Sequence, residues 1–245
     1  MPAAVPARVW VILPTFDEAE NIAPLVGAIR ERLPESHRIL IVDDNSPDGT
    51  GEIADRLAAE ADDVSVLHRE RKDGLGPAYL AGFELALAGG AELVVGMDAD
   101  FSHDPAHLPA LIGAAENADL VLGSRYVEGG GVTDWGPVRR FISRGGSVYA
   151  RLMLGVGVRD LTGGFKVFRR QVLESIDLGS ITARGYAFQV ETTYRAIRRG
   201  FRVVEVPIVF RDRLEGSSKM SGPIVAEAIW RVPAIRLRRR WRRST

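Results

Sequence analysis

The sequence contains no cysteine among its 245 residues. This absence excludes a disulfide framework, a thiolate metal site and a cysteine nucleophile. The first residues lack the basic segment and apolar stretch of a signal peptide, and no uninterrupted apolar run is long enough to span a bilayer. We therefore expect a protein of the reducing cytoplasm that is soluble or lies on a membrane surface.

Two common nucleotide-binding signatures are also absent. No G-x-G-x-x-G follows the first predicted strand, and no G-x-x-x-x-G-K-[ST] occurs anywhere in the chain. A dinucleotide dehydrogenase and a P-loop nucleotidase are therefore not expected. A nucleotidyltransferase that makes nucleotide-sugars is disfavoured for a similar reason, because it would carry a basic, glycine-rich loop after the first strand.

The chain has no net formal charge, since 32 lysines and arginines balance 32 aspartates and glutamates. The distribution is uneven, however. Acids cluster in the first half, whereas the C-terminus is crowded with arginines, namely Arg231, Arg236, Arg238, Arg239, Arg240, Arg242 and Arg243. This asymmetry points to an anionic partner for the last residues of the chain.

The first half alternates short apolar runs with helical patterns. Strands are predicted at 9–13, 38–42, 64–67, 92–97 and 119–125, and helices are predicted to follow them, beginning near Asn21, Thr50, Pro77 and Pro105. Strands that alternate with helices over short loops favour a three-layer α/β fold with an open, mostly parallel sheet.

The second half is less regular. We expect a mobile loop at 129–137, a helix at 139–154, a turn entering a strand at 160–168 and a helix from 185 to 199. A strand is predicted at 202–210, and its internal Pro207 indicates an edge position because proline cannot donate to a sheet ladder.

The stretch around Asp98 and Asp100 organises this layout. An apolar run ends there in two carboxylates spaced i, i+2, as expected for a buried parallel strand that delivers charge to its carboxyl end. Alternate residues of an extended segment point the same way, so both acids can bind one hard cation, with Mg²⁺ or Mn²⁺ the best suited. The alternative is a simple helix-capping turn in which Asp104 and Pro105 start the next helix.

The turns after the first two strands also present acids. Glu18 follows the first strand, and Asp43 and Asp44 follow the second. Carboxylates at such turns suit ribose hydroxyls or base N–H groups, whereas glycine-rich turns suit phosphate. The charge of a phosphate must then be met elsewhere, by a metal and by arginines.

A polar loop with two separated cations, Arg213 and Lys219, follows the last predicted strand. Its glycine and serine content is compatible with a lid that closes over a diphosphate by charge-assisted hydrogen bonds. A solvated surface loop is the alternative.

Six motifs together carry a resemblance to a known family. They are PTFDEAEN (14–21), DDNSPDGT (43–50), MDADFSH (97–103), GSRY (123–126), DLTGGF (160–165) and DRLEGSSK (212–219). From Val9 to about Gly222, the chain resembles the dolichyl-phosphate mannosyltransferases and, within them, the bacterial polyprenol monophosphomannose synthases. The resemblance implies an inverting GT-A glycosyltransferase domain at 1–222, with GDP-mannose as donor, a polyprenyl monophosphate as acceptor and Mg²⁺ or Mn²⁺ as cofactor.

The resemblance also implies roles for individual residues. Donor-binding residues would be Pro14, Phe16, Glu18, Val42, Asp44, Asp98, Ala99, Asp100, Arg213 and Lys219. Asp98 and Asp100 would hold the metal, together with Ser102, which stands where relatives often have glutamine. Arg125 and Arg139 would receive the acceptor phosphate, so that Asp100, Arg125 and Arg139 form the catalytic set. Phe16 replaces the usual tyrosine, which removes a phenolic hydrogen bond but keeps ring stacking.

The expected mechanism needs no strong protein base, because a phosphate monoester has its second pKa at about 6 and is largely ionised near neutral pH. In-line attack would convert an α-linked donor into a β-linked product. Glu191 lies where many related transferases place a base. Here we expect it to orient an arginine or sugar hydroxyls, and an ordinary acid of an amphipathic helix is the alternative.

Residues 223–245 are predicted to form a basic amphipathic tail. Trp230, Ala234, Leu237 and Trp241 recur at helical spacing among arginines, which suits a helix at an anionic membrane surface, although Pro233 would kink or delay it. The predicted location is therefore the inner face of the cell membrane, without nucleic acid as a partner. Whether a separate membrane protein recruits the chain stays open. So do a UDP-glucose-dependent glucosyl transfer and a non-catalytic role as a nucleotide-sugar-binding partner of a membrane mannosylation enzyme.

Overall fold

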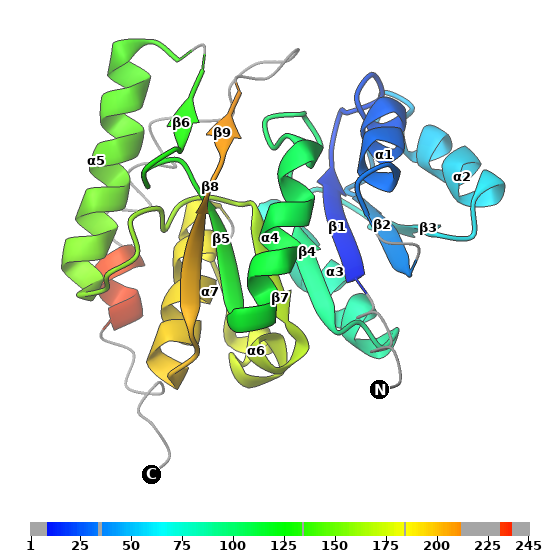
Figure 1. The fold of residues 1–245 in the computed structure, drawn as a ribbon. Helices are drawn as coiled ribbons and strands as arrows, with labels where there is room; N and C mark the ends of the chain where they lie inside the picture. Colours follow the sequence, from blue (N-terminus) through cyan, green and yellow to red (C-terminus); the bar gives the residue numbers. More distant parts are fainter. Residues whose placement is uncertain (1–8, 34–35, 134, 184, 212–230, 237–245) are drawn as a thin grey trace, which may run out of the picture.

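The computed structural model describes residues 9–33, 36–133, 135–183, 185–211 and 231–236. A seven-stranded sheet with the order β3-β2-β1-β4-β7-β5-β8 runs through its centre (Figure 1). The strands are β1 (Val9–Thr15), β2 (His37–Asp43), β3 (Val64–His68), β4 (Leu93–Gly96), β5 (Leu120–Ser124), β7 (Lys166–Arg169) and β8 (Val203–Pro207). Every pairing in this sheet is parallel except the two made by β7. A second, two-stranded sheet pairs β6 (Gly131–Val132) with β9 (Val209–Phe210).

Helices connect the strands. They are α1 (Ile22–Arg30), α2 (Thr50–Glu60), α3 (Leu75–Ala88), α4 (Leu108–Ala114), α5 (Pro137–Leu154), α6 (Arg170–Ser175) and α7 (Tyr186–Arg199). Short 3-10 helices lie at η1 (Pro105–His107), η2 (Ala115–Asn117) and η3 (Leu178–Ser180). In the described part of the chain, no helix is both long and apolar enough to cross a membrane.

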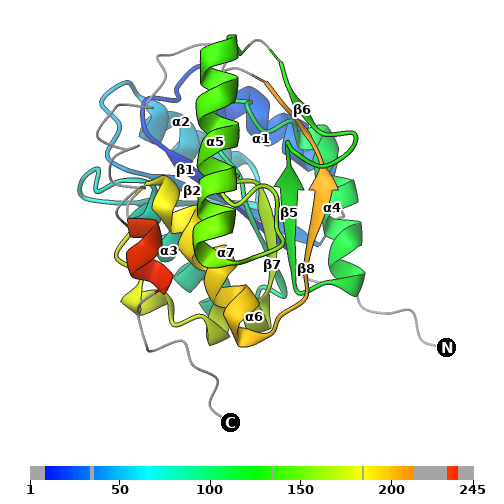
Figure 2. The same cartoon turned by 90° about the vertical axis from the view of Figure 1, so that its left-hand side faces the viewer.

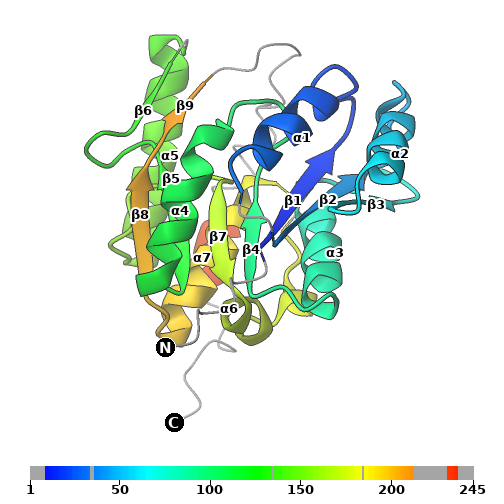
Figure 3. The same ribbon diagram turned by 45° about the vertical axis from the view of Figure 1, so that its right-hand side comes forward.

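The core has two halves because successive side chains of a strand point to opposite faces of the sheet. On β1, Ile12 packs into a cluster with residues of α3, α6 and α7, whereas Val11 and Leu13 pack into a cluster with α1, α2 and α4. Figure 3 shows α1 and α4 on the near side of the strands. This three-layer arrangement confirms the fold class expected from the sequence.

The second half departs from prediction in three places. β7 runs antiparallel between β4 and β5, and no local sequence pattern predicts that position in the sheet. The strand predicted at 202–210 is split, because Pro207 ends β8 and β9 joins a different sheet. The loop predicted at 129–137 contains β6 and the first residue of α5. The edge position of the strand that carries Pro207 is confirmed, since β8 is the last strand of the sheet.

Three residues other than glycine have left-handed backbone angles just beyond the carboxyl ends of neighbouring strands. Asp17 follows β1 with φ of 58°, Asn45 follows β2 with φ of 60°, and Phe101 follows β4 with φ of 58°. Asparagine and aspartate tolerate this region, but a bulky aromatic residue does so only under strain. Strain of this kind concentrates at functional sites, so this edge of the sheet is the first place to look for one.

Candidate active site

The turns after β1 and β2 lie side by side at this edge. Pro14 is in register with Val42 on the neighbouring strand, and the Asp44 amide donates to the Thr15 carbonyl at 3.1 Å. The Thr15 hydroxyl donates to Asp43 Oδ1 at 3.3 Å. The structure therefore brings the predicted nucleoside-binding residues of both turns together.

The Asp44 carboxylate is buried and paired with Arg69, a residue that sequence reasoning left out of the site. Burial raises the pKa of Asp44, and the Arg69 guanidinium lowers it but does not fully offset the effect of burial. Arg69 follows β3, the strand beside β2, and its amide donates to the Asp43 carbonyl at 2.8 Å. Its position at the end of the third parallel strand was the available signal.

Phe16 and Glu18 extend from the same edge. The ring of Phe16 lies under the Lys72 ammonium group, with Nζ 3.5 Å from the ring centroid. This cation–π contact holds a positive charge where the sequence predicts a nucleoside wall. The Glu18 carboxylate accepts from the Asn21 amide group at 2.9 Å, and the Glu18 amide donates to Thr50 Oγ1 at 2.9 Å.

Asp98 and Asp100 follow β4, which pairs with β1, so they lie beside these turns. The Asp98 side chain is 31% exposed, whereas Asp100 is only 3% exposed and accepts a hydrogen bond from the Ser102 amide at 3.1 Å. Ala99 is buried between them. The Ser102 hydroxyl is buried and has no hydrogen-bond partner among the described residues. An unsatisfied buried oxygen two residues after Asp100 is suited to a ligand that the protein alone does not supply.

Three residues that sequence reasoning missed lie against this acidic turn, and two of them form hydrogen bonds with Asp98. The Tyr79 hydroxyl donates to Asp98 Oδ1 at 3.2 Å, and burial together with Asp98 raises the pKa of Tyr79 well above its ordinary value. The Asp98 amide donates to Nδ1 of the buried His103 at 3.0 Å. Burial lowers the pKa of His103, which favours the neutral ring. Gly164 lies so close that a Cβ there would be 3.4 Å from Asp98 Oδ1.

Arg125 follows β5 and is almost fully buried. It makes a two-point ion pair with Asp160, with Nε to Oδ2 and Nη2 to Oδ1 both at 2.7 Å, and Nη2 also donates to Thr162 at 2.9 Å. Burial by itself would raise the pKa of Asp160, but the Arg125 guanidinium outweighs it and holds that pKa below its usual value. The predicted turn at 160–168 is therefore what fixes the orientation of the predicted phosphate-binding arginine.

An aromatic residue links Arg125 to Arg139. The Trp135 ring lies 5.8 Å from the Arg125 guanidinium carbon and 4.4 Å from that of Arg139, at the start of α5. Phe210 also contacts this group, at 5.4 Å from Arg125 and 5.4 Å from Trp135. The structure thus brings the two predicted acceptor arginines to one aromatic cluster.

Glu191 is buried on α7 and forms an i, i+4 ion pair with Arg195. Arg195 in turn donates to the carbonyls of Ile176 at 2.8 Å and Asp177 at 2.7 Å. Glu191 therefore pairs with an arginine of its own helix and is buried, whereas a role in orienting sugar hydroxyls stays a prediction.

Lys166 is also buried, and it contacts the same helix as Glu191 and Arg195. Its Nζ donates to the Gln189 carbonyl at 2.6 Å and to Thr193 at 2.9 Å. Burial lowers its pKa to about 7, against the opposing effect of Asp160. No sequence pattern indicates this burial, because a lysine in a short strand is ordinarily exposed.

Two predicted regions lie wholly or partly outside the described residues. Arg213 and Lys219 belong to the undescribed part of the chain, as do Trp230, Leu237 and Trp241. Residues 231–236 are described, and there Val232 and Ile235 are buried in the core cluster of α3, α6 and α7. Ala234, one of the predicted membrane-facing residues, is exposed.

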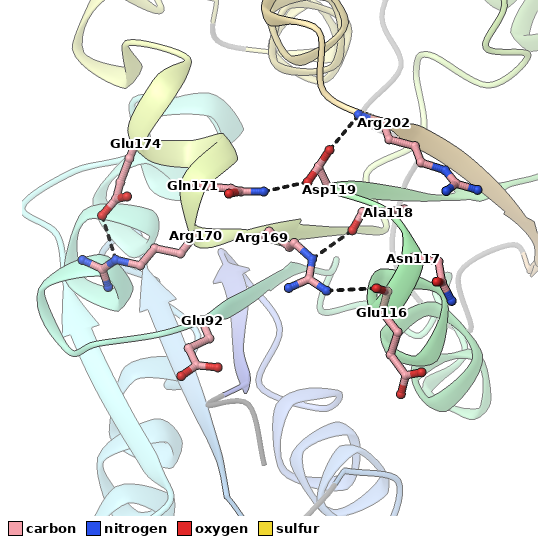
Figure 4. A pocket seen from close by; sticks show the side chains of 10 residues that line it. All are labelled: Glu92, Glu116, Asn117, Ala118, Asp119, Arg169, Arg170, Gln171, Glu174 and Arg202. Carbon is pink, nitrogen blue, oxygen red and sulfur yellow. Dashed lines mark hydrogen bonds and ion pairs between the residues drawn. The ribbon is translucent and has the colours of Figure 1, made fainter. Parts of the chain in front are cut away.

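A pocket of about 610 Å³ lies at the amino-terminal ends of the parallel strands β4, β5 and β8, away from the acidic turns (Figure 4). Two of its arginines serve the fold: Arg169 donates to the Ala118 carbonyl at 3.1 Å, and Arg170 donates to the Leu87 carbonyl at 3.0 Å. Donors at such positions satisfy the carbonyls left over at helix ends. We therefore assign this pocket a structural role.

No cluster of three or more histidine, aspartate or glutamate side chains suited to a metal occurs among the described residues. A cation at Asp98 and Asp100 would thus need further oxygens from water or a bound diphosphate, which is how Mg²⁺ is commonly held.

Comparison with solved structures identifies the fold. Glucosyl-3-phosphoglycerate synthase from Mycobacterium tuberculosis, solved with phosphoglyceric acid, aligns with a TM-score of 0.72 at 20% identity over 94% of this chain and 80% of that one. A complex of the same enzyme with Mn²⁺, UDP and glucosyl-3-phosphoglycerate aligns with a TM-score of 0.71 at 21% identity, with the same coverage. The chain has the GT-A glycosyltransferase fold.

Sequence comparison gives the family. Residues 10–177 match the model of glycosyl transferase family 2. The undecaprenyl-phosphate mannosyltransferase of Micrococcus luteus is 50% identical over 234 residues, 96% of each chain. The polyprenol monophosphomannose synthase of Mycolicibacterium smegmatis is 50% identical over 227 residues, 92% of this chain and 85% of that one. The chain belongs to glycosyl transferase family 2 and is a glycosyltransferase.

Proposed function

We propose that this glycosyltransferase transfers mannose from GDP-mannose to a polyprenyl monophosphate and inverts the anomeric configuration. The products are a β-linked polyprenyl phosphomannose and GDP. One observation carries the proposal: two relatives that are named for mannose and a polyprenol phosphate share half of their residues with this chain over almost its whole length.

The acidic turn supports a divalent cation as cofactor. Asp98 and Asp100 would hold it, and the buried Ser102 hydroxyl, which lacks a partner among the described residues, is an additional oxygen within the same turn. Mg²⁺ and Mn²⁺ both suit such oxygen ligands. When bound, the metal would supply positive charge to the departing diphosphate. A structural relative crystallised with Mn²⁺ and UDP is consistent with this role.

The donor nucleoside is assigned to the turns after β1 and β2. Pro14 and Phe16 offer partly exposed apolar surface, whereas the Val42 side chain is fully buried in the core and can only support this wall from within. Glu18 and Asp44 offer carboxylates for ribose hydroxyls or base N–H groups. Arg213 and Lys219 complete the proposed donor site as cations that close over the diphosphate.

The acceptor phosphate is assigned to Arg125 and Arg139. Asp160 fixes the Arg125 guanidinium through two hydrogen bonds of 2.7 Å, so little conformational freedom is lost when a phosphate binds. Trp135 is buried against both arginines, so its indole ring holds the two guanidinium groups beside one aromatic surface.

The reaction then follows from placement and charge. The ionised acceptor phosphate attacks the anomeric carbon from the face opposite the diphosphate, one C–O bond forms, and the C–O bond to the diphosphate breaks. No proton must be removed by a strong base, because the second pKa of a phosphate monoester is about 6. The protein's task is to hold two anions together and to stabilise the leaving group.

A UDP-glucose-dependent transfer is the second candidate, since solved relatives with this fold were crystallised with UDP-glucose. Their identity of 20% carries the fold and not the substrate, whereas the mannose-named relatives are 50% identical. A non-catalytic binding role is less consistent with the chain, because the paired acids and the ordered arginine are all present.

The test is transfer of labelled sugar from GDP-mannose and, in parallel, UDP-glucose to a polyprenyl monophosphate, with and without Mg²⁺ or Mn²⁺. We expect a mannosyl lipid that forms only with metal and whose anomeric configuration, determined by NMR, is β. A glucosyl lipid formed in preference would favour the second candidate. Absence of any lipid product would contradict the proposed acceptor.

We also propose that the protein works at the inner face of the cell membrane as a peripheral protein, because its acceptor lies in the bilayer. The C-terminal arginines would contribute attraction to anionic lipid. Recruitment by a membrane protein is a further route that remains to be tested by co-purification from membranes.

A further inference from the structure

α5 has an unusual surface for a helix of a folded domain. Large apolar side chains are exposed along it: Val138 is 69% exposed, Phe141 80% and Leu152 71%, with Ile142 at 43% and Val148 at 46%. Only one further large apolar residue, Leu85, appears in this exposed class among the described residues. Five such side chains on one helix mark an interaction site more often than chance exposure.

Four of these side chains form a stripe: Val138, Phe141, Val148 and Leu152 share one side of the helix, with Gly145 in the turn between Phe141 and Val148. Ile142 lies at the margin of this stripe. The buried residues Ser147, Ala150 and Leu154 lie on the opposite side and face the protein. Figure 2 shows α5 as the outermost element of this flank, in front of α7. The apolar stripe therefore faces outward along a helix of about 27 Å.

The charged residues of α5 are all positive. Its 18 residues include Arg139, Arg140, Arg144 and Arg151 and no acid. By helical geometry, Arg140, Arg144 and Arg151 share the flank between the buried side and the apolar stripe. Arginines in that position can extend to the headgroups while the stripe enters the acyl boundary. This pattern is typical of helices that lie in the plane of an anionic membrane.

α5 also connects this surface with the candidate active site. Arg139, in the first turn of the helix, lies against Trp135, which contacts Arg125. A bilayer along the stripe would therefore meet the protein beside the residues assigned to the acceptor phosphate.

We infer that the exposed stripe of α5 is the surface that docks the protein onto an anionic lipid bilayer, and that α5 lies parallel to the membrane plane. The choice of a bilayer over a second copy of the chain rests on charge complementarity and on the proposed lipid acceptor. Two copies joined through this stripe would bring their arginines together without compensating acids from the helix.

The test is binding to phosphatidylcholine vesicles with and without phosphatidylglycerol, measured by co-flotation. The double variant Phe141→Ser, Leu152→Ser removes the two most exposed apolar side chains of the stripe. We expect it to bind the anionic vesicles about tenfold or more weakly than the wild type. Both side chains are exposed, so an unchanged thermal unfolding curve would show that the fold is intact.

A matched control makes the same chemical change elsewhere. Leu85→Ser, on α3, alters an exposed leucine outside the stripe, and we expect vesicle binding equal to the wild type. The charge variant Arg144→Gln, Arg151→Gln should reduce binding to anionic vesicles and leave weak binding to neutral vesicles unchanged. Equal binding by the wild type and the stripe double variant would overturn the inference. So would a dimer that the double variant dissociates while vesicle binding stays unchanged.

A second assay separates this inference from the proposed function. Transfer to a short-chain, water-soluble polyprenyl phosphate without vesicles should be the same for the wild type and the stripe double variant, because neither substituted residue belongs to the proposed site. Failure of the wild type in this assay would count against the proposed acceptor, whereas vesicle binding would still decide the role of α5.

Discussion

The two sides of the candidate site are built in different ways. The proposed donor side consists of the turns after the parallel strands β1, β2 and β4, where the sheet places the acids of neighbouring turns beside one another. The acceptor side depends on β5, the antiparallel β7 and the start of α5, where Arg125 is fixed by Asp160 and shares Trp135 with Arg139. The first side is therefore built from consecutive strand–helix units. The second side depends on contacts between residues that are far apart in the sequence.

This difference decides which substrate each side suits. Carboxylates that need a cation or hydroxyl partner are appropriate for a metal and a nucleoside, whereas guanidinium groups, of which Arg125 is buried and fixed by Asp160, are appropriate for an anion. Substitutions on the two sides should therefore affect different substrates, and the following predictions test that separation.

The largest effect is expected for Asp100→Asn. Removing one charge from the acidic turn should lower the transfer rate by about a thousandfold, because the leaving diphosphate loses its charge compensation. Initial rates at saturating acceptor check this. Asp104→Asn is the matched control: Asp104 caps η1 by accepting from the Ala106 amide at 2.9 Å, and asparagine caps equally well. If Asp104→Asn lost as much activity as Asp100→Asn, the result would contradict a specific role for Asp100 in compensating the charge of the diphosphate.

Arg125→Ala should cost about 3–5 kcal/mol in the free energy of unfolding, because it leaves the buried Asp160 carboxylate without its partner. The loss should be largest at neutral pH. The folded-state pKa of Asp160 is below its ordinary value, so the pair stabilises the protein above pH of about 4 and the benefit disappears as the pH falls through that lowered pKa. Urea unfolding from pH 7 to pH 3 measures this.

The double variant Arg125→Ala, Asp160→Asn separates stability from function. We expect it to recover much of the lost stability while the KM for the acceptor stays high and the KM for the donor stays near the wild-type value. Recovery of acceptor binding in this variant would argue that Arg125 has only a structural role.

Tyr79→Phe should have a smaller effect confined to the donor side. It deletes one hydrogen bond of 3.2 Å to Asp98, and a bond to a charged group contributes about 1.5–3 kcal/mol. We therefore expect roughly tenfold or more weaker metal activation and an unchanged KM for the acceptor, measured by metal titration of the initial rate. A change in acceptor KM alone would break the proposed separation of the two sides.

Lys166→Met should have the smallest effect on transfer and a distinct effect on stability. The folded-state pKa of Lys166 is lowered to about 7 by burial, so the unfolded chain holds one more proton between pH 7 and about 10 and the wild type should gain stability over that range. The variant should lack this rise, which amounts to about 1.4 kcal/mol per pH unit. A rise of equal slope in both proteins would contradict the assignment.

The position of the acidic turns could largely be predicted from the sequence. Apolar runs that end in acids identify the carboxyl ends of parallel strands, and such ends share one edge of the sheet. The acceptor side could be predicted only by resemblance. Arg125 and Asp160 are 35 residues apart, and they meet because β7 enters the sheet antiparallel between β4 and β5, which no local periodicity indicates.

The contacts that support the acidic turn could not be predicted from the sequence for the same reason. Tyr79 looked like an ordinary apolar residue of α3, and only the approach of α3 to β4 places its hydroxyl at Asp98. The left-handed backbone of Phe101 is likewise set by the surrounding turn, since phenylalanine has no preference for it.

The most direct test of the central claim uses metal-stripped enzyme with an equimolar mixture of GDP-mannose and UDP-glucose and one polyprenyl monophosphate. We expect no lipid-linked sugar before metal is added, and mannosyl lipid as the main product after addition of Mg²⁺ or Mn²⁺ to the wild type but not to Asp100→Asn. Full activity of the stripped enzyme, or equal activity of Asp100→Asn, would contradict the assignment of the acidic turn as the metal and diphosphate site.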